Sequence, residues 1–275
     1  MRTVDLPNGR SLPVMGLGTW RMGEARSDKA AEIRVIQKAM DLGISLLDTA
    51  EIYGNGGSER VVGEAILGRR DSAFIVSKVA PSHATRKGTI SACEGSLTHL
   101  GIETLDLYLL HWRGGVPVSE TIDAFETLKA QGKIRAWGVS NFDVDDLEDI
   151  PDLTECSANQ VLYNPQSRGI EYSLLPLCQS HQIPIMAYTP FGQSGAVLKN
   201  AAIAGVAHRH NATPGQVILA WGIRHPGVVT IPKTATLARV EENLGALSLQ
   251  LTAEDLAEID RAFPPPRRKS SLEML

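Results

Sequence analysis

Four side chains that can take part in proton transfer stand in the first half of the chain. They are Asp48, Tyr53, Lys78 and His111. A tyrosine hydroxyl has an ordinary pKa of about 10, and a neighbouring lysine ammonium lowers this pKa because it stabilises the phenolate. An aspartate would keep the lysine charged, and a histidine opposite would donate a hydrogen bond to a carbonyl oxygen. The set suits protonation of a carbonyl group that receives hydride.

Three of these residues end apolar runs that are typical of buried parallel strands. The runs cover 45–48, 73–78 and 105–111, and Tyr53 follows the first run, just before the glycine-rich turn 54–57. The intervals are 30 residues from Asp48 to Lys78 and 33 from Lys78 to His111. Each interval suits one strand–helix unit. Because side chains alternate along a strand, all three polar groups are expected to point to the same place at the C-terminal ends of the strands, here called the mouth of the fold.

The same alternation of strand and helix continues along the chain and predicts an α/β fold, a (β/α)₈ barrel that forms one domain over residues 1–275. A two-residue turn at Asn8-Gly9 predicts an N-terminal β-hairpin that closes the bottom of the barrel. The other strands are expected at 15–20, 134–141, 158–161, 183–188 and 228–232. Helices are expected at 28–42, 58–67, 85–100, 118–130, 143–150, 174–181, 213–224 and 236–247, with an additional one at 252–263.

Composition excludes several classes of function. The chain of 275 residues is 43% hydrophobic and 21% charged, with a net charge of −4, so nothing indicates a nucleic-acid partner. Three cysteines show no pairing or metal spacing, which favours free thiols in a reducing compartment. The polar N-terminal residues and the lack of a long apolar run predict a cytoplasmic protein without membrane contact. We expect no metal, a small-molecule partner, and a monomer or weak oligomer.

A hydride donor must also bind, and the usual dinucleotide loop is missing. Gly16-Leu17-Gly18 lacks the third glycine and its spacing. The last expected strand instead ends in Ile231-Pro232-Lys233-Thr234, and Arg239 follows in the next helix. A lysine, a hydroxyl and an arginine near a helix N-terminus form a good phosphate site. This site favours NADPH over NADH.

Short motifs along the whole chain resemble those of the aldo-keto reductases. They occur in the family's order at 16–20, 47–54, 77–78, 105–112, 132–135, 138–142, 159–160 and 231–234. The resemblance implies an NADPH-dependent carbonyl reductase on a (β/α)₈ barrel. It implies that Tyr53 is the acid, that Lys78 and Asp48 support it, and that His111 orients the substrate.

The resemblance also implies roles for a larger set of residues. Ser140, Asn141 and Gln160 would hold the nicotinamide carboxamide, and Tyr188 would stack on its ring. The full cofactor set is Gly18, Thr19, Trp20, Asp48, Ser140, Asn141, Gln160, Tyr188, Pro190, Gly192, Ile231, Pro232, Lys233, Thr234, Ala235, Arg239, Glu242 and Asn243. Trp20, Tyr53, His111 and Trp112 would line the substrate pocket.

Three segments, 50–53, 159–163 and 167–172, look most like bacterial members that reduce methylglyoxal and similar small aldehydes. The loop after Tyr188 and the tail after Phe263 are both short compared with longer members of the family. We therefore expect an open pocket, a broad substrate range and weaker retention of NADPH.

Two other functions fit parts of the pattern. A buried lysine at a strand end is also the starting point of a Schiff-base aldolase, in which Lys78 would be the nucleophile. Some barrels of the resembled family serve as regulatory partners, so a non-catalytic nucleotide-sensing subunit is a third hypothesis. The phosphate site at Lys233 and Arg239 argues against the aldolase, and retention of all four polar residues argues against the sensing subunit.

Overall fold

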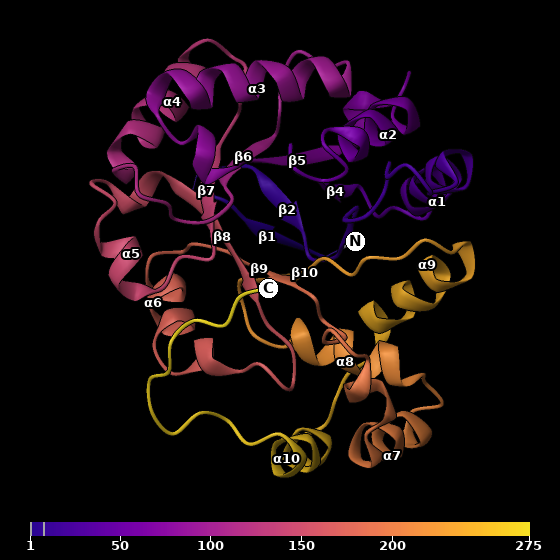
Figure 1. Ribbon diagram of the computed structural model, residues 1–275. Coiled ribbons are helices and arrows are strands. Elements are labelled where there is room, and N and C mark those ends of the chain that lie inside the picture. Colours follow the sequence, from indigo (N-terminus) through magenta and orange to yellow (C-terminus); the bar gives the residue numbers. More distant parts are fainter. Residues whose placement is uncertain (1, 8) are drawn as a thin grey trace.

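Eight parallel strands form a barrel with helices around its outside (Figure 1). The computed structural model describes residues 2–7 and 9–275. The strand order is β10-β9-β8-β7-β6-β5-β4-β3, and bridges from Met15 to Thr230 and from Gly18 to Lys233 join the last strand to the first. The strands are β3 (Gly16–Gly18), β4 (Leu46–Asp48), β5 (Phe74–Val79), β6 (Leu107–Leu110), β7 (Trp137–Ser140), β8 (Cys156–Leu162), β9 (Ile185–Tyr188) and β10 (Val228–Thr230).

The helices follow the strands as the sequence predicts, so the expected (β/α)₈ architecture is confirmed. They are α1 (Lys29–Asp41), α2 (Gly57–Ala65), α3 (Arg86–Leu100), α4 (Val118–Ala130), α5 (Val144–Glu148), α6 (Leu174–Ser180), α7 (Ala201–Arg209), α8 (Pro214–Gly222), α9 (Leu237–Leu244) and α10 (Ala253–Ala262). Capping boxes at Thr213 and Thr252 start α8 and α10. Helix α7, between β9 and α8, is not among the helix ranges expected above, and α10 is the expected additional helix.

An N-terminal hairpin closes one end of the barrel, as expected. Strands β1 (Thr3–Asp5) and β2 (Ser11–Pro13) are antiparallel, and Leu6 and Leu12 pack into the barrel interior. Their partners there include Leu46, Phe74 and Leu107, which begin β4, β5 and β6, so the hairpin covers the N-terminal ends of the strands.

The predicted two-residue turn of this hairpin is wrong. Asp5 pairs with Ser11, and the Leu6 N–H donates to the Arg10 carbonyl, which leaves a wider connection than Asn8-Gly9 alone. Asn8 itself lies outside the described residues.

A second core lies between the strands and the helices. It is built from outward-facing strand residues such as Ile75, Tyr108 and Val139, which pack against helix residues such as Phe125 and Leu128. Two packed layers therefore hold each strand, and the polar ends of the strands are fixed by apolar contacts below them. Within residues 2–7 and 9–275, no helix is both long and apolar enough to cross a membrane.

Candidate active site

The buried centre of the site is an ion pair between Lys78 of β5 and Asp48 of β4. Lys78 Nζ lies 2.8 Å from Asp48 Oδ1, and the two side chains are 0% and 4% exposed. The same ammonium donates to the carbonyl of Thr49 at 2.8 Å. Burial lowers the pKa of Lys78, but the charge of Asp48 and the contact with Tyr53 outweigh burial, so the net pKa is raised. Lys78 is therefore a fixed positive charge at the C-terminal edge of the barrel.

The part-buried Tyr53 lies above this pair, on the turn that follows β4. Lys78 Nζ donates to its hydroxyl at 3.5 Å and lies 5.0 Å from its ring centroid. Burial raises the pKa of Tyr53, Lys78 lowers it, and Asp48 raises it again. The net direction is upward, so the expectation of a lowered tyrosine pKa is wrong, although Lys78 acts in the expected sense. Burial outweighs the single ammonium, and the phenol stays protonated at neutral pH.

His111 follows β6 and faces the tyrosine. The rings of His111 and Tyr53 meet edge-on with centroids 5.6 Å apart, and Trp112 packs on the other side at 4.9 Å. Burial and the charge of Lys78 lower the pKa of His111 to about 2. Its Nδ1 is buried and makes no hydrogen bond within the described part of the chain. A neutral imidazole donates one hydrogen bond, which is the role expected from the sequence.

Four residues predicted to hold the nicotinamide form one hydrogen-bonded group beside His111. Asn141, in the left-handed region at φ 57°, donates to the His111 carbonyl at 3.1 Å and accepts from the Tyr188 hydroxyl at 2.8 Å. Ser140 Oγ donates to the Gln160 carbonyl at 2.9 Å. Gln160 Nε2 donates to Asp48 Oδ1 at 2.8 Å, which joins this group to the buried ion pair.

The predicted phosphate site lies where β10 leads into α9. Lys233 and Arg239 are exposed, and within residues 2–7 and 9–275 neither takes part in an ion pair. Thr236 precedes α9, and its own side chain makes no capping bond to the first turn of the helix. Its backbone N–H donates to the Thr234 hydroxyl at 3.2 Å. The bridge between Gly18 and Lys233 brings this site next to β3 and Trp20. A phosphate has cationic and backbone donors available here.

The remaining predicted residues occupy different environments. Thr19 is buried, and its hydroxyl donates to the Asp48 carbonyl. Trp20 is 49% exposed, with the Arg21 guanidinium 4.4 Å above its ring. Pro190, Ile231, Pro232, Thr234 and Asn243 are buried, Ala235 is exposed, and Glu242 accepts from the Thr213 hydroxyl at 2.6 Å.

The C-terminal tail reaches the mouth of the barrel, which the sequence did not predict. Figure 1 shows it leaving α10 and returning to the centre beside β9 and β10. Glu273 accepts a hydrogen bond from Ser167 at 2.7 Å, and the backbone of Leu275 bonds to Tyr188. Lys269 pairs with Asp145 at 3.1 Å. The short tail thus covers part of the mouth, and no local sequence signal indicates this path.

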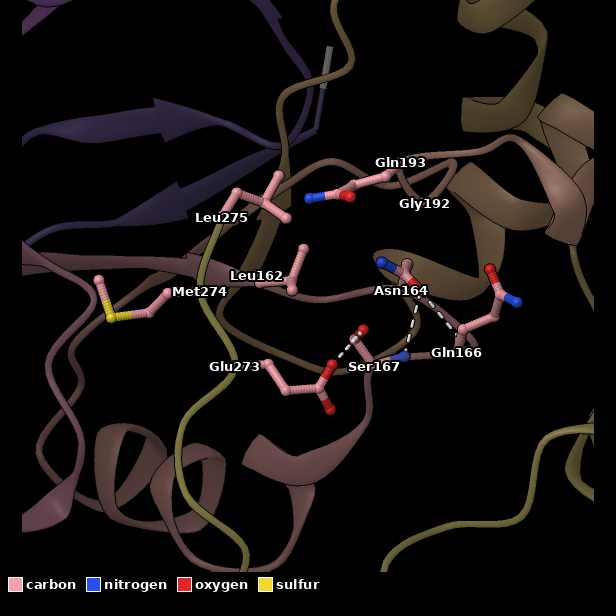
Figure 2. Close-up of a pocket in the computed structure, with 9 residues that line it drawn as sticks. All are labelled: Leu162, Asn164, Gln166, Ser167, Gly192, Gln193, Glu273, Met274 and Leu275. Carbon is pink, nitrogen blue, oxygen red and sulfur yellow. Dashed lines mark hydrogen bonds between the residues drawn. The ribbon is translucent and has the colours of Figure 1, made fainter.

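A cavity of about 340 Å³ lies between this tail and the loops after β8 and β9 (Figure 2). Its lining includes the predicted Gly192 but none of Asp48, Tyr53, Lys78 or His111. The lining side chains that the sequence analysis missed are Leu162, Asn164, Gln166, Ser167, Gln193, Glu273, Met274 and Leu275. Asn164 accepts from two backbone N–H groups of its own loop, an Asx pattern that its sequence 164–167 could have indicated.

The fold, with a buried polar cluster at the C-terminal ends of the strands, is that of a barrel enzyme. The model of the aldo/keto reductase family matches residues 14–263. The chain belongs to this family, as the resemblance in its motifs indicated.

Related proteins cover nearly the whole chain. Methylglyoxal reductase YeaE of Escherichia coli is 49% identical over 272 residues, which cover 96% of each protein. Glyoxal reductase of Bacillus subtilis is 38% identical and covers 94% of this chain and 91% of its own. An aldo/keto reductase of Klebsiella pneumoniae, crystallised with NADP and acetate, has a TM-score of 0.96, 46% identity and 99% coverage of both chains.

Proposed function

We propose that this enzyme uses NADPH to reduce aldehydes and ketones, including methylglyoxal-type dicarbonyls, to alcohols, with Tyr53 as the proton donor. One observation carries the proposal: Tyr53 lies between two different partners. The fully buried, charged Lys78 contacts its hydroxyl, and the neutral His111 ring meets its ring edge-on. The likeness to the two reductases of dicarbonyls supports this substrate class.

The residues fit NADPH in two separate places. Beside Tyr188, the amide and hydroxyl groups of Ser140, Asn141 and Gln160 form a hydrogen-bonded group of donors and acceptors that suits a nicotinamide carboxamide. At the start of α9, the exposed Lys233 and Arg239 offer two cations to a 2′-phosphate. The structure of the Klebsiella pneumoniae relative contains NADP. When bound, NADPH supplies the hydride.

The protein's own residues handle the proton. Tyr53 holds its proton at neutral pH because burial raises its pKa, and it can pass this proton to a carbonyl oxygen beside His111. The charge of Lys78 then stabilises the phenolate that remains, and Asp48 keeps Lys78 charged. His111 donates a hydrogen bond that orients the carbonyl oxygen.

The arrangement opposes the Schiff-base alternative. An amine must be neutral to attack a carbonyl, and a lysine that forms Schiff bases is activated by a lowered pKa. The net pKa of Lys78 is raised, and Asp48 lies 2.8 Å from its ammonium.

Substitution of the proposed acid tests the mechanism. Tyr53→Phe keeps the ring and removes the hydroxyl, so turnover of methylglyoxal should fall about 10²-fold or more, the scale of a lost general acid. NADPH affinity should change little. Activity is followed by NADPH absorbance and affinity by fluorescence titration. Retained activity would show that Tyr53 is not the donor. NADPH binding by the wild-type protein without turnover of any carbonyl would instead favour the nucleotide-sensing subunit.

Substitution at the phosphate site tests the cofactor assignment. Arg239→Ala should weaken NADPH by about tenfold or more, since one charge-assisted contact to phosphate is lost, and should leave NADH nearly unchanged. Arg261→Ala in α10, which also removes an arginine from an exposed helix position, is the matched control. Equal losses for the two cofactors would place the 2′-phosphate elsewhere.

A further inference from the structure

The turn that carries Tyr53 is attached to the end of β5 by an acidic side chain. Tyr53 lies in residues 50–56, between β4 and α2, here called the Tyr53 turn. The Glu51 carboxylate leaves this turn and accepts the backbone N–H of Ala80 at 2.6 Å. Ala80 stands two residues after Lys78. One side chain thus joins the residue that bears the phenol to the strand that bears the ammonium.

A second bond runs between the same segments. The Glu51 N–H donates to the Lys78 carbonyl at 3.3 Å, so Glu51 meets β5 with both its backbone and its side chain. The Glu51 side chain is only 14% exposed, and His83 lies 3.1 Å from both of its carboxylate oxygens. Ala80 is 5% exposed, so its N–H would lose its partner in a buried place if the carboxylate were removed.

The contact between the two catalytic groups depends on where this turn lies. The 3.5 Å between Lys78 Nζ and the Tyr53 hydroxyl is long for a hydrogen bond, so a small outward shift of the turn would end it. The ammonium is held independently by Asp48 and the Thr49 carbonyl and would stay in place. A movable phenol beside a fixed ammonium makes the anchor of the turn important.

We propose that Glu51 is a positioning residue that sets the distance from Tyr53 to Lys78 through its bond to the Ala80 N–H. This proposal rests on the function proposed above, with Tyr53 as proton donor. The relevant contact is the acceptor oxygen of Glu51, and its negative charge is not required.

Three variants separate these possibilities. Glu51→Ala removes the acceptor, whereas Glu51→Gln keeps an acceptor oxygen without the charge. Ala80→Pro removes the donor from the opposite side, and its backbone at φ −73° already suits proline. Because Ala80→Pro leaves Glu51 intact, it tests the same bond even if Glu51→Ala folds poorly.

A matched control removes a similar bond elsewhere. The Glu120 carboxylate of α4 accepts the N–H of Arg86, the first residue of α3, at 3.2 Å, and it makes no hydrogen bond to the Tyr53 turn in the described part of the chain. Glu120→Ala therefore measures the effect of losing a carboxylate that accepts a backbone N–H. Thermal unfolding of every variant records the purely structural cost.

We measure kcat as a function of pH for alcohol oxidation and for carbonyl reduction. A purely structural role of Glu51 would leave the pH dependence of kcat unchanged. Oxidation of an alcohol by NADP⁺ needs the Tyr53 phenolate, and a phenol farther from Lys78 has a higher pKa. In Glu51→Ala and Ala80→Pro the acidic limb of the kcat profile should move upward by about half a unit or more. The kcat for methylglyoxal reduction should fall about tenfold or more, and NADPH affinity should stay within about twofold. The other ionisable groups that face Tyr53, which are Asp48, Lys78, His111 and Tyr188, are unchanged in all variants.

The outcomes divide clearly. The proposal holds if Glu51→Ala and Ala80→Pro shift the acidic limb of the kcat–pH profile upward, while Glu51→Gln and Glu120→Ala keep the wild-type profile. Unchanged profiles in both of the first two variants would overturn it. An equal loss in Glu51→Gln would also overturn it, because the charge and not the acceptor would then matter. Absence of carbonyl reduction by the wild-type enzyme would count against the proposed function itself and is seen before any variant is made.

Discussion

Two buried aspartates at opposite ends of the barrel bind cations in different ways. Asp48 ends β4 at the mouth and contacts one ammonium, from Lys78, and one amide, from Gln160. Asp106 precedes β6 at the closed end and pairs with Arg10 at 2.8 Å and Arg70 at 2.7 Å. Both carboxylates are almost fully buried. Only the first lies beside a group whose proton can be transferred.

The partners explain this difference. Arginine keeps its charge at any ordinary pH, and three arginines surround Asp106, with Arg135 at 3.5 Å and the Ile75 N–H as a further donor. Arg10 comes from the hairpin connection, so this cluster fastens the hairpin to the barrel. Lys78 instead has a phenol within reach. Of two similar ion pairs, one therefore ties the hairpin to the barrel, and the other holds the ammonium to which we assign a role in the proposed reaction.

Loss of the mouth cation should have the largest effect. Lys78→Met keeps the apolar stem, removes the ammonium and leaves the phenolate of Tyr53 without stabilisation, so turnover should fall about 10³-fold. Lys129→Met, which breaks an exposed ion pair with Glu155, is the control and should leave turnover unchanged. If turnover of Lys78→Met falls by less than about tenfold, the ion pair at the mouth would not differ in function from the Asp106 cluster at the closed end.

Loss of charge at the closed end should cost stability instead. Asp106→Asn leaves Arg10 and Arg70 without their buried counter-ion, and the free energy of unfolding should fall by about 3 kcal/mol. Steady-state kinetics should stay close to wild type. Denaturant unfolding and turnover are measured on the same sample. Intact stability with reduced turnover would reverse the assignment of the two clusters.

His111 should also make the stability of the protein sensitive to acid. The pKa of His111 is about 2 in the folded protein against 6.5 ordinarily, so below pH 6.5 the unfolded chain binds the proton and the folded chain does not. Stability from this group is therefore lost as the pH falls, by about 2 kcal/mol between pH 7 and pH 5. His111→Gln should remove that part of the loss, whereas His208→Gln, at an exposed site, should not. Equal slopes for all three proteins would contradict the lowered pKa.

The sequence predicted the barrel and its polar mouth because both depend on spacing. The C-terminal ends of parallel strands must meet at one edge, so residues one strand–helix unit apart, such as Asp48, Lys78 and His111, converge wherever the exact strand limits fall. This reasoning needs no side-chain detail, and the structure brings these residues together with Tyr53.

What the sequence did not predict depends on distance and burial. The pKa of Tyr53 is set by competition between desolvation and one charge, and pattern alone cannot weigh the two. The bond from Glu51 to Ala80 and the path of the tail to Tyr188 are contacts between loops, whose geometry no periodicity encodes. Helix α7 is absent from the expected helix ranges although its start has a local signal, since the Asn200 side chain accepts the Ala202 N–H at 2.9 Å.

The way the barrel closes has a mechanical consequence. Neighbouring strands elsewhere pair over runs of residues, whereas β3 and β10 meet through separate bridges at Met15 and Gly18. The barrel wall therefore has one junction, between β3 and β10, with fewer strand-pairing contacts than the others. We call this junction the seam, and a change in the circumference of the barrel meets the least resistance there. The seam runs between Trp20 and Lys233, so a molecule that contacts both sides would act as a brace across it and stiffen the whole cylinder.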